Sequence, residues 1–323
     1  MAKILITGGA GFVGYHLCSV LSEDSSNDIV VLDNLQRGRL DEDLTQLIGR
    51  ANVSFVQGDL TDVELFRTLN RDFEYIYHLA AVIGVQNVMD NPDRVLYVNA
   101  ISTFNVLEYA KGLNKLKKLL FSSTSEVYAG TLKHYGLDVP TAEDVPLVID
   151  DVALERTTYA LSKIYGESSC LMYARKHALP VSIIRYHNVY GPRMGFSHVI
   201  PEMFVKIRNS SKVEVFSPSH TRAFCYVDDA VTYTRLIAES GDSLGLTYHV
   251  GNSSEEITIA DLVGKISRVM DREIEIEEAG DTIGSPVRRC PDVSNAVRLT
   301  GHNPSVNLIE GIKKTYHWYR SRI

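Results

Sequence analysis

The chain of 323 residues is poor in cysteine and tryptophan, with four and one respectively, and it has no long apolar run. Its cysteines are far apart and include no Cys-x-x-Cys pair, which argues against a disulfide framework and for a reducing compartment. The longest weakly polar stretch, Tyr75–Val85, contains His78 and is too short to span a bilayer. The first residues lack the features of a signal peptide. We therefore expect a cytoplasmic protein with no membrane partner.

Basic residues are not in excess, since 33 Lys and Arg stand against 40 Asp and Glu, a formal charge of −7. This balance gives no bulk attraction for nucleic acid, although it allows a local basic site for a small anion. The ten histidines show no metal-ligand spacing, so we expect no metal.

Short β-branched segments alternate with helical patterns over the first two-thirds of the chain. The expected strands are Ile4–Thr7, Ile29–Asp33, Val53–Gln57, Tyr75–Leu79, Lys118–Ser122 and Val181–Arg185, and the expected helices between them are Phe12–Ser22, Asp62–Asn70, Asp93–Lys111 and Tyr159–His177. Nearly continuous apolar strands separated by helices predict an α/β fold with a doubly wound parallel sheet.

After Arg185 this rhythm stops, and Pro and Gly punctuate the chain. Helical patterns remain at Pro201–Asn209, Asp228–Ser240 and Ile259–Met270. We expect a first domain over residues 1–186 and a smaller region over residues 187–323. If Asp228–Ser240 packs on the sheet, the two regions are interleaved.

A glycine-rich segment joins the first strand to the first helix. Gly8, Gly11 and Gly14 are spaced by three, and Phe12 and Val13 open the helix. Such a turn lets the backbone approach a pyrophosphate at the helix N-terminus. The spacing differs from G-x-G-x-x-G, and an ordinary Gly-rich turn is the alternative.

Two acidic residues follow the next two strands. Asp33, with Asn34, ends the second strand, where a carboxylate binds a ribose 2′-hydroxyl and favours NAD over NADP. Arg37 and Arg39 lie close behind and leave NADP open. Asp59, with Leu60, follows the third strand and is suited either to the adenine amino group or to a local cap with Thr61.

Tyr159 and Lys163 are one helical turn apart and share a face. A nearby ammonium favours a phenolate, which a free Tyr does not form at neutral pH. The fifth strand ends in hydroxyl groups and a carboxylate, including Thr124 and Glu126, at the sheet edge where ligands bind. Thr124 is suited to a hydroxyl or keto oxygen, and Glu126 to proton transfer.

Together these motifs resemble those of the extended short-chain dehydrogenase/reductases, and more narrowly the NAD-dependent nucleotide-sugar epimerase/dehydratase group, including UDP-glucuronate decarboxylases. The matching segments are Thr7–Gly14, His78–Ala81, Asn99, Ser123–Tyr128, Tyr159–Lys163 and Tyr190–Arg193. The resemblance implies a Rossmann-like domain that holds NAD and a C-terminal region that holds a nucleoside-diphosphate sugar.

The resemblance also implies residue roles. Tyr159 is the base at the sugar 4-hydroxyl, Lys163 assists it and binds the nicotinamide ribose, and Thr124 is the third catalytic member. Further residues on the cofactor side are Leu79, Ala80, Ala81, Asn99 and Val189.

Substrate binding is implied for residues of the second region and for Ser125. These are Asn188, Arg222, Arg289 with Arg288 as its alternate, and His198 and Val199. Guanidinium groups suit diphosphate oxygens. For His198, a hydrogen-bonded loop histidine is the alternative.

The triplet Thr124-Ser125-Glu126 resembles that of the decarboxylases. It favours a Glu126-dependent step at C5 or C6 after C4 oxidation, namely dehydration, decarboxylation or epimerisation. The alternatives are a simple C4 epimerase, a net C4 dehydrogenase and a non-catalytic NAD-binding regulatory protein. The family also implies a homodimer through Asp93–Lys111 and Tyr159–His177, although core burial explains their apolar faces equally well.

Overall fold

The computed structural model describes residues 2–281 and 286–323. The chain forms two compact units. Unit 1 comprises Met1–Tyr135, Pro146–Arg185 and Val231–Tyr248, and unit 2 comprises Gly136–Val145, Tyr186–Ala230 and His249–Ile323. The chain therefore passes between the units several times, and one crossing lies between Arg185 and Tyr186.

A seven-stranded sheet in the order β11-β6-β5-β4-β1-β2-β3 forms the centre of unit 1. Its strands are β1 (Lys3–Thr7), β2 (Asp28–Asp33), β3 (Val53–Gln57), β4 (Tyr75–His78), β5 (Lys118–Thr124), β6 (Val181–Tyr186) and β11 (Thr247–Val250). The central strands pair in parallel, with β1 between β2 and β4. The predicted doubly wound parallel sheet is confirmed.

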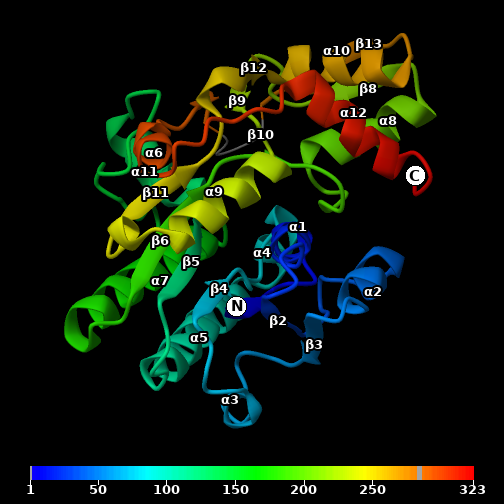
Figure 1. Cartoon of the computed structure of the whole chain (residues 1–323). Helices are drawn as coiled ribbons and strands as arrows, with labels where there is room; N and C mark the ends of the chain where they lie inside the picture. The colour runs from blue at the N-terminus through cyan, green and yellow to red at the C-terminus, as the bar shows by residue number, and fades with distance from the viewer. Residues whose placement is uncertain (1, 282–285) are drawn as a thin grey trace. The chain divides into compact units, whose positions relative to one another are not determined.

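Helices flank this sheet, as Figure 1 shows. They are α1 (Phe12–Leu21), α2 (Glu42–Ile48), α3 (Leu65–Thr68), α4 (Val85–Asp90), α5 (Pro92–Lys111), α6 (Ala129–Tyr135), α7 (Thr157–His177) and α9 (Val227–Glu239), which begins in unit 2. The 3-10 helices η1 (Ser125–Tyr128) and η2 (Gly241–Ser243) are short. One core cluster joins Phe66 of α3, Val106 of α5 and Cys170 of α7 to sheet residues such as Leu5 and Ile76.

The expected helix Asp62–Asn70 is shorter in the structure, which has only α3 there. Asp62 accepts a hydrogen bond from the Glu64 amide and forms a turn, so the helix begins later. The short helices α2, α4 and α6 were not expected, because they contain too few turns to show a clear period.

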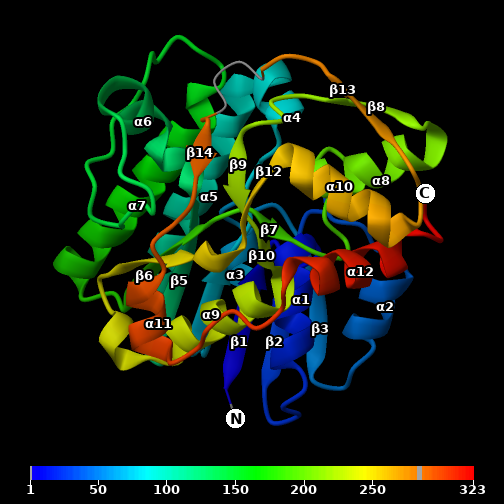
Figure 2. The same cartoon turned by 90° about the horizontal axis from the view of Figure 1, so that it is seen from above.

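Unit 2 is built from short strands in small sheets together with helices. Its elements are β7 (Val189–Tyr190), α8 (Val199–Asn209), β8 (Lys212–Val215), β9 (Thr221–Ala223), β10 (Cys225–Tyr226), η3 (Ser253–Glu255), β12 (Glu256–Thr258), α10 (Ile259–Met270), β13 (Glu275–Glu278), β14 (Arg288–Arg289), α11 (Ser294–Thr300) and α12 (Leu308–Tyr319). Figure 2 shows α8, α10 and α12 beside one another, and they are in contact. Thr258 caps α10 by accepting a hydrogen bond from the Asp261 amide.

The segment Gly136–Val145 is fixed within unit 2 by backbone and side-chain hydrogen bonds. The Thr141 amide donates to the Cys290 carbonyl, and the Asp292 amide donates to the Thr141 carbonyl. Glu143 accepts from the His249 amide and from the Asn295 side chain.

Within the described ranges, no helix is both long enough and apolar enough to cross a membrane.

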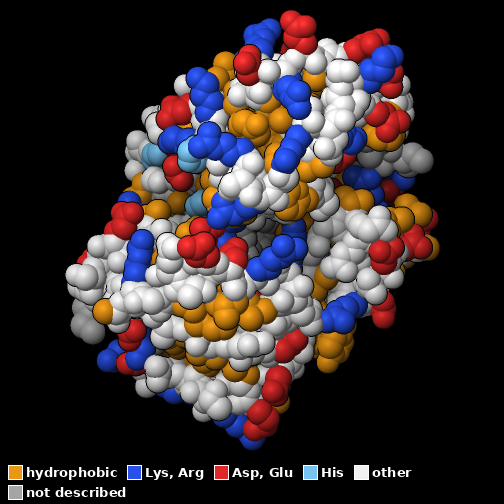
Figure 3. All heavy atoms as spheres, turned by 90° about the vertical axis from the view of Figure 1, so that its right-hand side faces the viewer, with side chains coloured by type: hydrophobic (Ala, Val, Ile, Leu, Met, Phe, Trp, Pro, Cys, Tyr) orange, Lys and Arg blue, Asp and Glu red, His pale blue; other side chains and the backbone are white. Residues whose placement is uncertain are grey.

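Acidic and basic side chains both occur over the face displayed in Figure 3. The net charge of −7 therefore does not arise from an exclusively acidic surface there. A small anion therefore binds where Lys and Arg side chains are arranged close together, whatever the net charge of the chain.

Candidate active site

The glycine-rich loop between β1 and α1 packs without room for side chains. Gly8 has a φ of 71°, and a Cβ there would lie 2.7 Å from the Ala80 amide nitrogen. A Cβ at Gly14 would lie 2.3 Å from the Gly8 carbonyl oxygen. The loop therefore lies against Leu79 and Ala80, and these sequence-predicted residues are brought together.

Helix α1 begins at Phe12, and the N–H groups of its first turn, including those of Phe12 and Val13, have no acceptor within the helix. Its N-cap, Gly11, has no side chain to occupy them. Such an N-terminus, with its positive dipole end, favours an anion such as a pyrophosphate. The cradle fits a dinucleotide.

The two acidic residues are both held by hydrogen bonds. Asp33 accepts from the Ala10 amide at 3.1 Å and the Leu35 amide at 2.8 Å, although burial dominates and raises its carboxyl pKa. Each carboxylate oxygen keeps a further lone pair for a ligand hydroxyl.

Asp59 accepts from the Thr61 amide and hydroxyl and from Asn34 at 3.2 Å. These bonds, with the charge of Arg94, outweigh burial and lower the Asp59 pKa. Asp59 is thus hydrogen-bonded both to the Asn34 side chain and, in a local turn, to Thr61. The neighbouring Leu60 is buried, and its carbonyl accepts from Asn105.

A buried chain of hydrogen bonds connects β1 with α7. Thr7 and His78 share a bond of 2.8 Å, His78 and Thr103 one of 3.2 Å, and Thr103 donates to the Asn99 carbonyl. Because the Thr103 proton is used, His78 donates from Nε2 and accepts at Nδ1 as a neutral imidazole. Burial lowers the His78 pKa to about 3, which keeps this state at neutral pH.

Asn99 ends this chain by holding the loop after Ala81. Its side chain accepts from the Val82 amide at 2.7 Å and donates to the Val82 carbonyl and to Ser162. Ser162 in turn donates to the Tyr159 carbonyl. Sequence reasoning named Asn99 but missed Thr103 and Ser162, because isolated polar residues in a helix give no local signal.

Tyr159, Thr124 and Glu126 interact at the C-terminal edge of the sheet. Burial, the largest cause, and the Glu126 charge raise the pKa of the Tyr159 phenol above its ordinary value, and a hydrogen bond with Thr124 and the Arg37 charge offset this only in part. Thr124 also accepts from the Glu126 amide at 3.2 Å, and the neighbouring Ser125 is buried. The structure therefore brings a phenol, a hydroxyl and a carboxylate together.

Lys163 is 4% exposed and donates to the Ser122 carbonyl at 2.9 Å, with its ammonium 5.1 Å from the centre of the Phe121 ring. Burial lowers its pKa to about 8, against the opposing charges of Cys170 and Glu167. Arg37, considered from the sequence only for cofactor choice, is the cation whose charge partly offsets the raised pKa of Tyr159.

In unit 2, β9 lies between β12 and β14. Arg222 of β9 pairs in register with Arg289 of β14, and Thr221 pairs with Arg288. Because register partners lie on one face of a sheet, Arg222 and Arg289 share a face and Arg288 lies on the other.

The other face carries an acidic partner that the sequence did not reveal. Glu256 accepts two hydrogen bonds from Arg288, at 2.7 and 2.8 Å, and a third from Thr221. The Glu256 interaction raises the Arg288 pKa. Arg288 thus forms an ion pair with Glu256, while Arg222 and Arg289 lie side by side on the opposite face, with Arg222 donating to the Thr221 carbonyl.

The remaining predicted substrate residues lie at turns and helix starts of unit 2. Asn188 has a φ of 40° and donates to the Ala223 carbonyl, which ties it to β9, and Val189 begins β7. His198 precedes α8, whose first residue is Val199, and its Nδ1 donates to the Gly195 carbonyl at 3.1 Å. His198 is therefore hydrogen-bonded within its own loop, as the alternative to a substrate contact describes.

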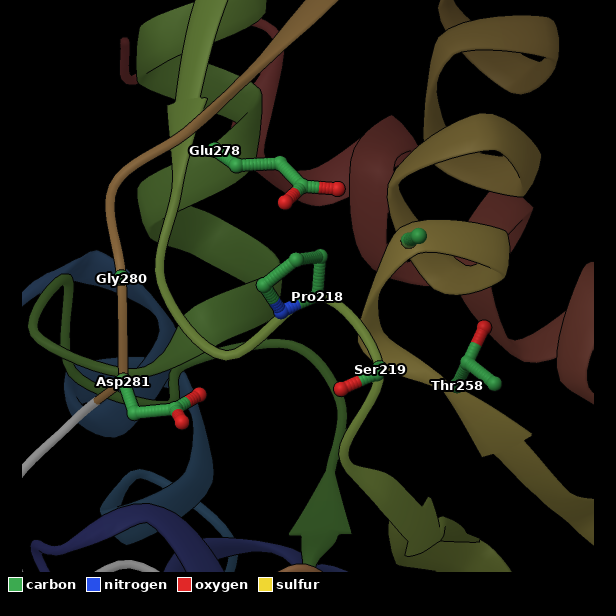
Figure 4. Close-up of a pocket in the computed structure, with 7 residues that line it drawn as sticks. Pro218, Ser219, Thr258, Glu278, Gly280 and Asp281 are labelled. Carbon is green, nitrogen blue, oxygen red and sulfur yellow. The ribbon is translucent and has the colours of Figure 1, made fainter.

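A pocket of about 500 Å³ in unit 2 is separate from all of these residues. Figure 4 shows Ser219, Thr258, Glu278 and Asp281 around it. It contains two carboxylates and none of the predicted anion-binding arginines, so its chemistry is unsuited to a diphosphate.

The match to known proteins covers most of the chain. Residues 4–251 match the NAD dependent epimerase/dehydratase family, and the chain belongs to this family. This confirms the expected NAD-dependent enzyme class.

Curated relatives match nearly the full length. UDP-glucuronic acid decarboxylase 6 of Arabidopsis thaliana is 31% identical, over 99% of this chain and 90% of the relative. UDP-N-acetyl-alpha-D-glucosaminuronate decarboxylase of Bacillus cytotoxicus is 30% identical, over 98% of both.

A solved structure extends the likeness to the fold. UDP-glucuronic acid 4-epimerase of Bacillus cereus, in complex with UDP-glucuronic acid and NAD, has a TM-score of 0.87 and 26% identity over 99% of this chain and 100% of its own. The expected Rossmann-like sheet is confirmed.

Proposed function

We propose that this protein decarboxylates a UDP-linked uronic acid after transient oxidation at the sugar C4. The observation that carries the proposal is the position of Glu126 in the turn directly after Thr124, whose hydroxyl accepts from the Glu126 amide at 3.2 Å. The Glu126 carboxylate thus provides a second proton-transfer group near the Tyr159 phenol, whose pKa its charge raises. The decarboxylase relatives support the uridine nucleotide and the uronic acid.

We assign the glycine-rich loop between β1 and α1, Asp33 and Asp59 to NAD. At Gly8 and Gly14 of this loop there is no room for a side chain. Asn34, Leu60, Asn99 and the backbone of Leu79–Ala81 support this side of the site, and Val189 is assigned to the nicotinamide. When bound, NAD supplies the reversible redox partner for C4.

Tyr159 takes the proton of the sugar 4-hydroxyl. Burial and the Glu126 charge hold the pKa of this phenol above its ordinary value, and Thr124, through its hydrogen bond, and the Arg37 charge are the groups that favour the phenolate against them. Lys163, held by the Ser122 carbonyl, binds ribose hydroxyls and adds positive charge below pH 8.

The resulting 4-keto group lies β to the C6 carboxylate. When the C5–C6 bond breaks, CO2 leaves and the electron pair is taken up by the C4 carbonyl as an enolate. A proton then returns to C5, and we assign this transfer to Glu126. C4 is finally reduced again, with Tyr159 returning its proton to the C4 oxygen, so the net change is loss of CO2. Ser125 is assigned to a substrate hydroxyl.

We assign the diphosphate to Arg222 and Arg289. Strand register puts these two arginines side by side on one face of adjacent strands, and two neighbouring guanidinium groups suit the several oxygens of one diphosphate. Arg288 is the weaker candidate because Glu256 already binds its guanidinium. Asn188, His198 and Val199 are assigned to the sugar side.

The test is mass spectrometry of products after incubation with NAD and UDP-glucuronic acid. The proposal expects loss of CO2. Unchanged mass with inversion at C4 supports a C4 epimerase instead, loss of water a dehydratase, loss of two hydrogens a net dehydrogenase, and no turnover with UDP-, GDP-, dTDP- or CDP-sugars a regulatory protein.

The Glu126→Gln variant tests the second proton-transfer group. We expect C4 oxidation and CO2 loss to persist while formation of the fully reduced, decarboxylated sugar falls by about 10²-fold, since general acid–base groups contribute on this order. The matched control is Glu155→Gln, which removes an exposed carboxylate of unit 1. Equal loss of both steps in Glu126→Gln would contradict the assignment.

We also propose a homodimer through α5 and α7. Each helix carries two large apolar side chains seven residues apart that are more than 40% exposed, Tyr97 and Phe104 on α5 and Tyr165 and Met172 on α7. A second copy would cover these stripes. Sedimentation should give a dimer that Tyr97→Glu weakens and that Val63→Glu, at an exposed position outside both helices, leaves intact.

A further inference from the structure

Arg185, at the end of β6, lies outside the set of residues assigned to cofactor or substrate, yet it contacts two elements of the catalytic region. It is 5% exposed, and its Nε and Nη2 donate to the two oxygens of Glu167 at 2.8 and 2.6 Å. Its Nη1 donates to the Tyr128 hydroxyl. The centre of its guanidinium is 5.0 Å from the centre of the Tyr128 ring.

The two partners belong to the elements that carry the proposed reactive groups. Tyr128 is the last residue of η1, which contains Ser125 and Glu126 and follows Thr124. Glu167 lies on α7, one turn beyond Lys163 and two beyond Tyr159. One planar guanidinium therefore connects the turn that carries Glu126 with the helix that carries Tyr159.

Stability does not account for such an arrangement. A buried ion pair seldom stabilises a fold more than well-packed apolar side chains would, because both charges lose solvation. What it provides is directionality, since the donors of the guanidinium leave in fixed directions. A geometric function explains the network better than an energetic one.

We propose that Arg185 is a positioning residue that fixes Glu126 relative to Tyr159 by holding Tyr128 and Glu167 at the same time. This inference rests on the proposed function, in which Glu126 acts after C4 oxidation. Loosening the Tyr128 side of this clamp affects the Glu126 step, while Tyr159, Thr124 and Lys163 still carry out the first step. The decarboxylated 4-keto sugar then leaves before C4 is reduced again, and the reduced cofactor that remains is exchanged for NAD supplied in excess.

The experiment uses the NAD-loaded full chain and Tyr128→Phe, which removes the hydroxyl and keeps the ring and the Arg185–Glu167 pair. With excess NAD present, mass spectrometry measures the ratio of released 4-keto sugar to decarboxylated sugar that has been reduced at C4, two species that differ by two hydrogens. We expect this ratio to rise about tenfold, since displacements near 1 Å have effects of this order or larger.

Arg185→Lys provides an independent variant. Its ammonium can pair with Glu167 but lacks the fork that also reaches Tyr128, so we expect the same direction of change. It also avoids leaving Glu167 buried without a cation, which would threaten folding in Arg185→Met.

Tyr109→Phe is the matched control. Tyr109 is likewise buried in unit 1, and its hydroxyl donates to the Asn70 carbonyl, away from η1. It should keep the wild-type ratio. A wild-type ratio in Tyr128→Phe, or an equal change in Tyr109→Phe, overturns the positioning role.

Hydrogen–deuterium exchange separates this inference from the proposed function. If the wild-type protein forms no keto sugar, the proposed function fails, but the clamp still predicts faster amide exchange in residues 125–131 of Tyr128→Phe than of Tyr109→Phe. Equal exchange in the two variants overturns the clamp whatever the reaction is.

Discussion

Unit 1 and unit 2 position their polar groups by different means. In unit 1, Thr124 ends a seven-residue strand and Tyr159 lies in the first turn of a 21-residue helix, both anchored in one core. In unit 2, Arg222 and Arg289 lie on strands of three and two residues. Long elements fix a side chain by burial along their length, whereas short strands depend on the register with their neighbours.

This difference corresponds to a division of chemical labour in the proposed mechanism. The residues of unit 1 are assigned to proton transfer, and those of unit 2 to binding the diphosphate. Substitutions of the proton-transfer residues in unit 1 should therefore lower kcat, while substitutions of the diphosphate-binding arginines in unit 2 should raise KM.

The largest expected effect is that of Tyr159→Phe. Removing the phenol oxygen eliminates the base, so kcat with UDP-glucuronic acid should fall by about 10³-fold while NAD binding persists. Product formation and NAD binding are measured separately. Tyr165→Phe, exposed on the same helix, should keep wild-type turnover. Full turnover in Tyr159→Phe would refute the assignment of the base.

A second prediction concerns the stability of unit 1. Lys118 is 2% exposed and donates to Ser182, Ser243 and the Ser240 carbonyl, and burial lowers its pKa from 10.5 to about 8. Between these two values the unfolded chain binds more protons than the folded chain, so the free energy of unfolding rises with pH. The contribution of Lys118 to this rise in the free energy of unfolding is about 3 kcal/mol between pH 8 and pH 10.5.

Denaturant unfolding at several pH values measures this effect. Lys118→Met should make the rise smaller but not remove it, because burial lowers the pKa of Lys163 to about 8 as well and this group contributes in the same window. Lys117→Met, at the adjacent and largely exposed position, should preserve the full rise. A rise as large in Lys118→Met as in the wild-type protein would show that Lys118 does not contribute to it.

The smallest expected effects are those of the unit 2 arginines. Arg222→Met and Arg289→Met should each raise KM by about tenfold with little change in kcat, because each removes charge-assisted hydrogen bonds to the diphosphate. Arg288→Met is the control and should have a smaller effect, since Glu256 binds this side chain. A larger effect of Arg288→Met would reverse the assignment.

The sequence alone predicted much of unit 1, because its signals are local. Buried parallel strands appear as nearly continuous apolar runs, and the turn at Gly8 requires a residue without a side chain. The ends of these strands then place Thr124 and Glu126 at the sheet edge where ligands bind.

The composition excluded a polyanion partner but left a small anion possible, and the sequence favoured Arg289 with Arg288 as its alternate. Only the tertiary structure gives a physical reason for this preference, since strand register puts Arg289 beside Arg222 while the Arg288 side chain binds Glu256. It also decided that Lys163 binds the Ser122 carbonyl and that Arg185 joins η1 to α7. These contacts link residues far apart in the chain, and no local period or spacing encodes such pairs.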